Sequence, residues 1–362
     1  MLCRRTNGWV NRLILNMALA IFSSCLMLSP HILSAKALEK VSVGVSPTTS
    51  TGGVFVAFEK GYFKEEGLDV DLRVFASSTA PMLPLLAKGD LDVGGGNITA
   101  GLFASNMDGA GVLLVADKGS VRKDADYLKL MIRTDLIASG RYKSYRDLKG
   151  MKVGMTVLGG TSQEAAFSRF LGKGGLRPSD VVFVKAGYAE AGKLFAAKGL
   201  DAFIQLEPYV TDLEKSGAAK VVDGLYSIHP GQQSAAIFYS PVFAAKKPEV
   251  ATRFMKAYIR GCRDYNQAFR SDRKGEDFKQ LVAILSKWTS IKDSGVYQEM
   301  VPAGLGDDGR LNVKALEEDI SYFLAQKYLP SRPDMKKLIR VEFVEKALVE
   351  LAQHDRAKVS RK

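Results

Sequence analysis

Four short segments of the chain, rich in hydroxyl, amide and glycine residues, come directly after strand-like runs. They are residues 46–53, 77–79, 94–99 and 159–162. In an open parallel sheet, ligands bind beyond the carboxyl ends of the strands, where the following helices begin. Helix N-termini carry unpaired N–H groups and a partial positive charge, so they can bind anionic oxygens without a charged side chain. The pattern therefore predicts a cleft for a polar or anionic molecule.

Hydroxyl, amide and aromatic side chains in and near these segments are the candidate ligand groups. Each hydroxyl or amide has a structural alternative, because Ser, Thr and Asn are also preferred helix N-caps. Glycines beside Asn97 and Thr161 allow close approach to the backbone, which favours a binding role there. Glu207, which precedes Pro208, could cap a helix or bind a ligand N–H. The candidate binding residues are Thr48, Thr49, Ser50, Thr79, Asn97, Thr99, Thr161, Ser162, Tyr188 and Glu207.

Residue combinations for catalysis or metal binding are missing from the sequence beyond residue 37. Its histidines are His229 and His354 and its cysteine is Cys262, so it offers no N/S metal cluster. No Gly-x-Ser-x-Gly elbow and no Gly-x-x-x-x-Gly-Lys-Ser/Thr phosphate loop occurs. We therefore expect a binding protein without a cofactor, not an enzyme.

The elements that would position the polar loops occur twice, 110 residues apart. Val43-Gly44-Val45 and Ala87-Lys88-Gly89 in the first copy correspond to Val153-Gly154-Met155 and Ala197-Lys198-Gly199 in the second. Each copy predicts a strand, a polar loop, a helix, a Gly-Leu turn, a second strand, a second helix that ends at Lys-Gly, and a third strand. Strands that alternate with helices imply parallel pairing, so we expect two α/β lobes.

The last third of the chain has the pattern of a helical region. Predicted helices begin at Lys247 and cover residues 276–288, 312–328 and 337–352. Two extended segments, residues 128–132 and 237–240, are best placed as crossings between the lobes. We therefore expect a discontinuous first lobe and an inserted second lobe, made respectively of residues 38–132 plus 237–362 and of residues 133–236.

Residues 1–37 have the pattern of a secretory signal peptide, with basic residues, an apolar run over residues 13–28 and a cleavage site at Ala35-Lys36-Ala37. The run has 16 residues, fewer than the ~20 of a spanning helix, so an uncleaved anchor and a lipoprotein cut before Cys25 are the weaker alternatives. Cleavage lowers the net charge from +12 to +8, spread along the chain. We expect a periplasmic protein without a nucleic-acid partner.

Several segments of the chain form one recurring combination of motifs. They are Ala57-Phe58-Glu59-Lys60-Gly61-Tyr62-Phe63-Lys64-Glu65-Glu66-Gly67-Leu68-Asp69-Val70, Lys88-Gly89-Asp90-Leu91-Asp92-Val93, Asp147-Leu148-Lys149-Gly150 with Lys152-Val153-Gly154, Gly160-Thr161 with Gly175-Leu176, and Asp201-Ala202 with Glu207-Pro208-Tyr209. This combination resembles the nitrate/sulfonate/taurine-type substrate-binding proteins of ABC importers, over about residues 41–270. The resemblance implies a periplasmic-binding-protein-like α/β fold with two lobes, each a mainly parallel sheet flanked by helices, with two crossing strands and C-terminal helices.

The resemblance also implies that the loops containing the candidate residues hold a solute between the lobes. The expected protein is a monomeric receptor that delivers a small sulfonate-, taurine- or nitrate-like solute to an ABC permease in the inner membrane. Related thiamine-synthesis enzymes depend on a His and a Cys-rich motif that this chain lacks. A binder of a thiamine-precursor pyrimidine or aromatic solute, or a sensor input protein for a signalling receptor, remains an alternative. No predicted cleft loop contains Arg, so hydroxyls and backbone N–H groups would bind the anion.

Overall fold

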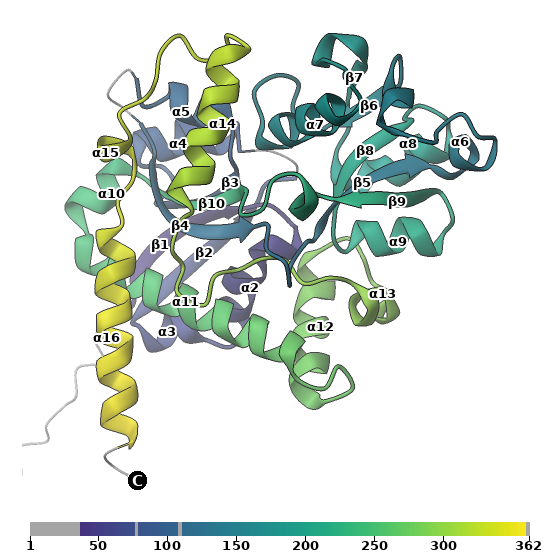
Figure 1. Ribbon diagram of the computed structural model, residues 1–362. Coiled ribbons are helices and arrows are strands. Elements are labelled where there is room, and N and C mark those ends of the chain that lie inside the picture. Colours follow the sequence, from purple (N-terminus) through teal and green to yellow (C-terminus); the bar gives the residue numbers. More distant parts are fainter. Residues whose placement is uncertain (1–36, 77–78, 108–110, 360–362) are drawn as a thin grey trace, which may run out of the picture. The chain divides into compact units, whose positions relative to one another are not determined.

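The computed structural model describes residues 37–76, 79–107 and 111–359 of the chain, and these form two mixed five-stranded sheets with helices packed around them (Figure 1). The predicted signal peptide lies outside the described residues, except for Ala37 at its end. Ser77 and Ser78 of the second polar loop also lie outside them. No described helix is both long enough and apolar enough to cross a bilayer.

The first sheet has the strand order β2-β1-β3-β10-β4. β1 pairs in parallel with β2 and β3, whereas β10 runs antiparallel to its neighbours β3 and β4. We call this sheet and the helices that follow its strands the first lobe. Its strands are β1 (Glu39–Val45), β2 (Leu68–Val74), β3 (Val93–Asn97), β4 (Leu113–Ser120) and β10 (Gln233–Tyr239).

The second sheet repeats this arrangement with the order β7-β6-β8-β5-β9, in which β5 is the antiparallel strand. Four of the five strands in each sheet run in one direction, so the prediction of two mainly parallel sheets is confirmed. We call this sheet and its helices the second lobe. Its strands are β5 (Leu128–Arg133), β6 (Lys152–Met155), β7 (Val182–Lys185), β8 (Ala202–Leu206) and β9 (Ala219–Gly224).

Each antiparallel strand comes from the part of the chain that enters the sheet from the other lobe. β5 is hydrogen-bonded between β8 and β9, and β10 between β3 and β4. The chain crosses between the sheets through residues 121–127 and 225–232, before the segments expected to be the crossings. Residues 128–132 therefore lie in the second sheet and residues 233–236 in the first, so the expected boundaries after residues 132 and 236 do not coincide with the division between the sheets.

Two local expectations were wrong. Gly94, Gly95 and Gly96 lie inside β3 and are not part of a loop, because β1 and β10 pair with this strand on its two sides. The left-handed residue that follows the helix of the second copy is Lys198, with φ 57°, whereas Gly89 has this conformation in the first copy. Only the first Lys-Gly pair therefore uses its glycine for the cap.

The helices of the two lobes begin where their strands end, as the alternating pattern predicts. In the first lobe these are η2 (Thr49–Thr51), α2 (Gly52–Glu59), α3 (Tyr62–Glu65), α4 (Met82–Lys88) and α5 (Ala100–Ala104). The second lobe contains α6 (Thr134–Ala138), η3 (Tyr145–Leu148), α7 (Ser162–Lys173), η4 (Pro178–Asp180), η5 (Tyr188–Glu190), α8 (Ala191–Ala196), α9 (Tyr209–Lys215) and η6 (Leu225–Ser227).

The C-terminal region is helical, as predicted. Its helices are α10 (Pro241–Lys246), α11 (Pro248–Arg270), α12 (Glu276–Trp288), α13 (Ser294–Glu299), α14 (Val313–Ala325), α15 (Met335–Leu338) and α16 (Glu342–Val359). The predicted helix over residues 337–352 is wrong at its start, because the chain between α15 and α16 pairs with β4. Ile339 forms a bridge with Leu114, and the Arg340 N–H donates to the Leu114 carbonyl at 2.9 Å.

Candidate functional site

The helix starts that follow β3 and β6 meet where the two lobes face each other. Thr99 forms an isolated antiparallel bridge with Thr161. Two backbone hydrogen bonds flank this bridge, from the Ala100 N–H to the Gly160 carbonyl at 2.7 Å and from the Ser162 N–H to the Ile98 carbonyl at 3.1 Å. The predicted loops of the two copies are therefore in direct contact across the lobe boundary.

The two bridging threonines serve as N-caps. The Thr99 hydroxyl accepts from the Leu102 N–H at 3.1 Å, and the Thr161 hydroxyl accepts from the Glu164 N–H at 3.0 Å. These bonds satisfy N–H groups that have no partner within the helix. For both residues the structure therefore confirms the capping alternative, and Thr161 in addition lines a cavity.

A cavity of about 20 Å³, which we call the inner cavity, lies between the lobes. A space of this size holds about one water molecule. It brings together half of the predicted binding residues with several polar residues that were not predicted. Its polar lining consists of Ser50, Asn97, Tyr127, Thr156, Thr161, Ser162, Gln163, Tyr188, Gln232 and Ser234.

A second pocket of about 220 Å³, which we call the outer pocket, shares Asn97 and Tyr188 with the inner cavity. It too is lined from both lobes, and Ser290 adds a residue that follows α12. Pockets for drug-sized ligands have volumes of about 300–1,000 Å³, so this space suits a smaller molecule. Its lining consists of Ser46, Pro47, Thr48, Ala76, Asn97, Gly187, Tyr188, Ala189, Glu190, Tyr209 and Ser290.

Tyr188 stands between the two spaces. Its hydroxyl is hydrogen-bonded by the side chains of Asn97, from the first lobe, and Thr156, from the second. Burial raises the pKa of Tyr188 to about 12, so the phenol is uncharged at neutral pH. The Tyr188–Asn97 contact links the lobes, and both residues line the inner cavity and the outer pocket.

Besides Thr99, three predicted residues line neither the inner cavity nor the outer pocket. The Thr49 hydroxyl donates to the Glu207 carbonyl at 2.5 Å, across the lobe boundary, and the Thr79 hydroxyl donates to the Asn97 carbonyl at 2.8 Å. The Glu207 carboxylate accepts from the Thr211 N–H at 3.0 Å and from the Val301 N–H at 3.2 Å. These side chains position the backbone around the cleft, and Glu207 takes the capping alternative because its oxygens face α9.

Burial raises the pKa of the Glu207 carboxyl, and the hydrogen bonds from Thr211 and Val301 act in the opposite direction. Among the described residues that line the two spaces, Glu190 is the one carboxylate, and no His or Cys is present. No group of three or more His, Cys, Asp or Glu side chains in the described chain is arranged to hold a metal ion. The arrangement can bind and enclose a small molecule, but it offers no evident general acid–base pair.

Lys118, which is not among the residues predicted from the sequence, is 1% exposed and donates to the Ser50 hydroxyl at 3.1 Å. Ser50 in turn lines the inner cavity. Every residue of β4 is buried, including the charged pair Asp117-Lys118. The signal that could have identified Lys118 from the sequence is a pair of adjacent charged residues at the end of an apolar, strand-like run.

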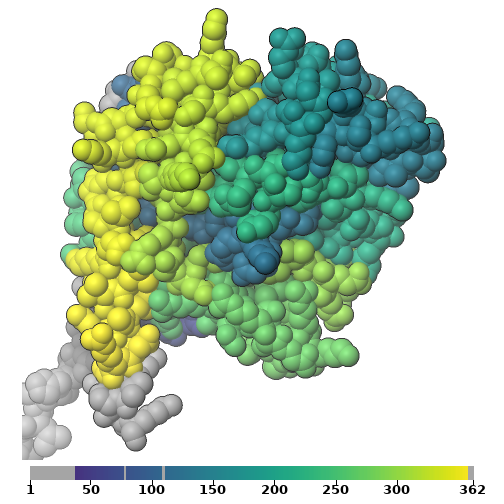
Figure 2. Space-filling model, viewed as in Figure 1, coloured from purple at the N-terminus to yellow at the C-terminus, as the bar shows by residue number. Residues whose placement is uncertain are grey.

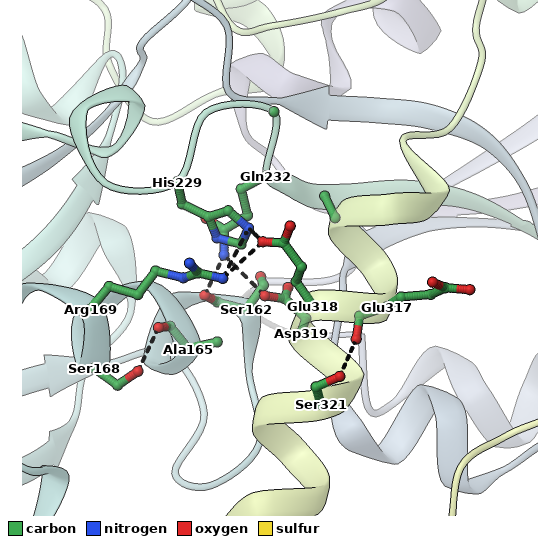
Figure 3. A network of polar contacts seen from close by, with 12 residues as sticks. Ser162, Ala165, Ser168, Arg169, His229, Gln232, Glu317, Glu318, Asp319 and Ser321 are labelled. Carbon is green, nitrogen blue, oxygen red and sulfur yellow. Dashed lines mark hydrogen bonds and ion pairs between the residues drawn. The ribbon is translucent and has the colours of Figure 1, made fainter. Parts of the chain in front are cut away.

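A second polar group joins the lobes beside the inner cavity, which its member Gln232 lines. We call it the α14 cluster: Arg169, His229, Gln232, Glu318 and Asp319. Figure 3 shows Arg169 and His229 both directed at Glu318 on α14. The Glu318 carboxylate lies 3.0 Å from Arg169 Nη2 and 3.0 Å from His229 Nε2. In Figure 2 the yellow-green surface of α14 adjoins the teal surface of the second lobe, where α14 contacts α7.

A family model described as NMT1/THI5 like matches residues 48–268, more than half of the chain. The chain belongs to the NMT1/THI5-like family. The matched residues include the lining of the inner cavity and every strand of the two sheets except β1.

Curated relatives of this NMT1/THI5-like chain carry different functional names. A Brucella abortus protein named only as a binding protein is 31% identical over 147 residues, which make up 41% of each chain. The match thus spans less than half of that relative. A Bacillus subtilis protein provisionally named as an aliphatic sulfonates-binding protein is 26% identical over 87% of this chain and 90% of its own. The Saccharomyces cerevisiae 4-amino-5-hydroxymethyl-2-methylpyrimidine phosphate synthase THI13 is 26% identical over 60% and 64%, respectively.

Solved structures share the fold of the NMT1/THI5-like chain. The alkanesulfonate-binding protein SsuA from Xanthomonas axonopodis pv. citri, bound to MOPS, has a TM-score of 0.65 at 18% identity and covers 84% of this chain and 99% of its own. The periplasmic nitrate-binding protein NrtA from Synechocystis PCC 6803 has a TM-score of 0.67 at 16% identity over 87% and 89%. The predicted periplasmic-binding-protein-like fold is therefore confirmed.

Proposed function

We propose that this chain is a periplasmic receptor that captures a small polar or anionic organic solute between its lobes and delivers it to an ABC import permease. One observation carries the proposal: residues from the first and second lobes line the same inner cavity and the same outer pocket. A solute bound there contacts both lobes only when they are closed, so it stabilises the closed form. That form is what a permease would recognise.

The relatives and fold neighbours support this class of function. One relative is named for aliphatic sulfonates, one structure contains MOPS bound to an alkanesulfonate-binding protein, and another is a nitrate-binding protein. The polar lining described above supplies hydroxyl and amide groups for such oxygen-rich solutes. Export after cleavage near Ala37, and a monomeric receptor, are parts of the same proposal.

A second candidate is a receptor for a thiamine-precursor pyrimidine or another aromatic solute. The aromatic rings of Tyr188 and Tyr209 in the outer pocket favour it, since flat rings suit a planar ligand. A pyrimidine phosphate synthase is among the relatives. Turnover by this chain lacks support, because the described lining of the two spaces contains Glu190 but no His or Cys.

Native mass spectrometry of the mature protein purified from the periplasm of its host tests the proposal. We expect a small-molecule adduct that is released chemically unchanged on denaturation, and small-angle scattering should show a more compact particle when the solute is added back. Chemical conversion of the released solute during incubation, or the lack of any adduct together with no binding of sulfonate, nitrate or pyrimidine probes, would contradict the receptor function.

Replacement of Asn97 with Ala sharpens the test. Asn97 lines both spaces and bonds to Tyr188, so its loss should weaken binding of the co-purified solute by about 1–3 kcal/mol, roughly 5- to 150-fold. Titration calorimetry measures the change. Thr99→Ala is the matched control, because Thr99 caps α5 without lining either space; it should cost about 1 kcal/mol of folding stability and leave affinity within twofold. Equal affinities of Asn97→Ala and wild type would assign Asn97 a structural role only.

A further inference from the structure

Lys118 is a buried lysine whose ammonium group forms no ion pair within the described chain, although the carboxylate of the preceding residue, Asp117, acts on it from further away. Its ammonium nitrogen has one hydrogen-bond acceptor among the described residues, the Ser50 hydroxyl at 3.1 Å. No described carboxylate lies within 4 Å of that nitrogen. An ammonium group carries three donors and loses strong hydration on burial, so it requires charged or multiple polar partners. The Lys118 ammonium group therefore lacks a negatively charged hydrogen-bond acceptor among the described residues.

The neighbouring carboxylate cannot fill this role because its oxygens are already engaged. Asp117 accepts from the Gly119 N–H at 2.8 Å, the Gly306 N–H at 2.7 Å and Gln233 Nε2 at 2.6 Å. These bonds direct the Asp117 carboxylate toward β10 and the chain before α14. Lys118 extends away from them, toward η2.

The fold keeps a path open for the Lys118 side chain. A Cβ atom added to Gly95 in β3 would lie 3.0 Å from both Cδ and Cε of Lys118, so a side chain there would crowd the lysine. A Cβ on Gly119 would lie 2.5 Å from the Tyr127 hydroxyl and 3.2 Å from the Ser234 hydroxyl, both of which line the inner cavity. The absence of a side chain at Gly95 thus leaves room for Lys118 to reach Ser50, which lines the inner cavity.

We propose that Lys118 is the counter-charge for an anionic group of the solute, of the sulfonate or carboxylate kind, which binds beside Ser50 at the start of η2. This inference rests on the proposed receptor function and assigns the chemistry of its solute. The Ser50 hydroxyl lines the inner cavity and lies next to the ammonium, so both groups would contact the same anionic group. Opening of the lobes is required for entry, because the inner cavity holds only about 20 Å³.

The ionisation of Lys118 makes this binding depend on pH. Burial lowers the pKa of Lys118 to about 7, and Asp117 opposes the shift. Burial raises the pKa of Tyr127, Tyr258 and Cys262 on the surrounding elements, so they stay neutral near pH 7. Arg122 and Asp307 are charged groups that act on Cys262. An anion should therefore bind most strongly below pH 7, where Lys118 is charged.

Calorimetric titration with ethanesulfonate and with its neutral analogue ethanesulfonamide tests the proposal. We expect wild type to prefer ethanesulfonate at pH 6, and Lys118→Met to lower that affinity at least tenfold without affecting ethanesulfonamide. Lys123→Met is the control, since Lys123 is exposed five residues further along the chain; its affinity for both probes should match wild type.

If Lys118→Met does not fold, the dependence of ethanesulfonate affinity on pH in the wild-type protein tests the proposal instead. Between pH 6 and pH 9 the affinity for ethanesulfonate should fall by roughly 10- to 100-fold, whereas that for ethanesulfonamide should stay constant. A flat profile, an unchanged affinity in Lys118→Met or a lack of ethanesulfonate binding would overturn the role of Lys118. A co-purified neutral solute would overturn it too, yet uphold the receptor function.

Discussion

Two polar groups lie beside the inner cavity, and their charges are arranged in opposite ways. Lys118 presents a cation to the neutral Ser50 hydroxyl, with the neutral Tyr127 and Ser234 side chains nearby. In the α14 cluster, by contrast, the Glu318 carboxylate faces the Arg169 guanidinium and the His229 imidazole, and Asp319 accepts from the Gln232 amide. The first group therefore lacks a negative charge, whereas the second contains its own.

The two groups also differ in how well their hydrogen-bonding atoms are satisfied. Among the described residues, His229 Nδ1, Gln232 Oε1 and Asp319 Oδ2 are buried without a partner, all within the α14 cluster. Burial lowers the pKa of His229 to about 4 and raises that of Asp319, so both side chains are held toward their neutral forms. An anionic ligand can therefore supply the negative charge that the Lys118 site lacks. The α14 cluster, in contrast, is suited to holding the lobes together.

The largest expected effect is on folding stability after replacement of Lys118 with Met. The pKa of Lys118 falls from 10.5 to about 7 on folding, so the unfolded chain binds more protons between these values and stability rises with pH across that window. Below pH 7 the buried charge costs on the order of 5 kcal/mol. Lys118→Met removes this cost, although Ser50 loses a donor.

Urea unfolding of the ligand-free protein at pH 6 and pH 9.5 measures the change. Lys118→Met should be more stable than wild type at pH 6, and the gain should shrink at pH 9.5. Exposed Lys123, changed to Met, should show neither effect. A variant less stable than wild type at pH 6 would contradict the view of Lys118 as an uncompensated cation.

Asp319→Asn should have an intermediate effect. Asp319 is fully buried, and its raised pKa means that the unfolded chain loses this proton at lower pH than the folded protein does. Its contribution to stability is therefore complete below the unfolded pKa of 3.8 and declines as pH rises. The amide avoids that decline, so the variant should be more stable by about 1–3 kcal/mol at pH 7.5.

Thermal unfolding at pH 4 and pH 7.5 tests this expectation. The stabilisation should nearly vanish at pH 4, and the exposed neighbour Glu317, changed to Gln, should leave the melting temperature unchanged at both pH values. A destabilised Asp319→Asn protein at pH 7.5 would show that the carboxylate has a charged partner, which would make the α14 cluster more like a paired salt bridge.

The smallest effect on stability is expected for Arg169→Met. Arg169 and Glu318 are 38% and 39% exposed, so solvent screens their ion pair and its loss should cost less than about 1 kcal/mol. Because the pair joins α7 to α14, the closed form loses a contact and solute affinity should fall roughly two- to fivefold. Calorimetry with the co-purified solute measures this.

Arg141→Met provides the control for that experiment, since Arg141 is exposed on the second lobe. Its affinity should equal that of wild type. An unchanged affinity in Arg169→Met would mean that the α14 cluster does not contribute to closure. The cluster would then have no role in solute binding to set against that of Lys118.

Local sequence patterns were sufficient for most elements of the fold. Capping residues, glycines and alternating apolar positions predicted the repeated strand–helix order, and α12 has the predicted bounds, Glu276–Trp288. They also placed Asn97, Thr161 and Tyr188 at a common site, and all three line the inner cavity. Such predictions succeed because caps, turns and amphipathic faces depend on neighbours within a few residues.

Contacts between distant segments decided the rest. Residues 128–132 joined the second sheet because β8 and β9 pair with them. The Thr49 hydroxyl bonds to the Glu207 carbonyl, 158 residues away, and the Glu207 carboxylate bonds to Thr211 and Val301, so neither side chain lines the cleft. The position of the Lys118 side chain depends on its hydrogen bond to Ser50, 68 residues away, and on the space that Gly95 leaves. Local sequence was enough to specify which segments form strands, helices and caps. Tertiary packing decided which polar side chains remain free to bind a solute, because it sets their burial and their long-range partners.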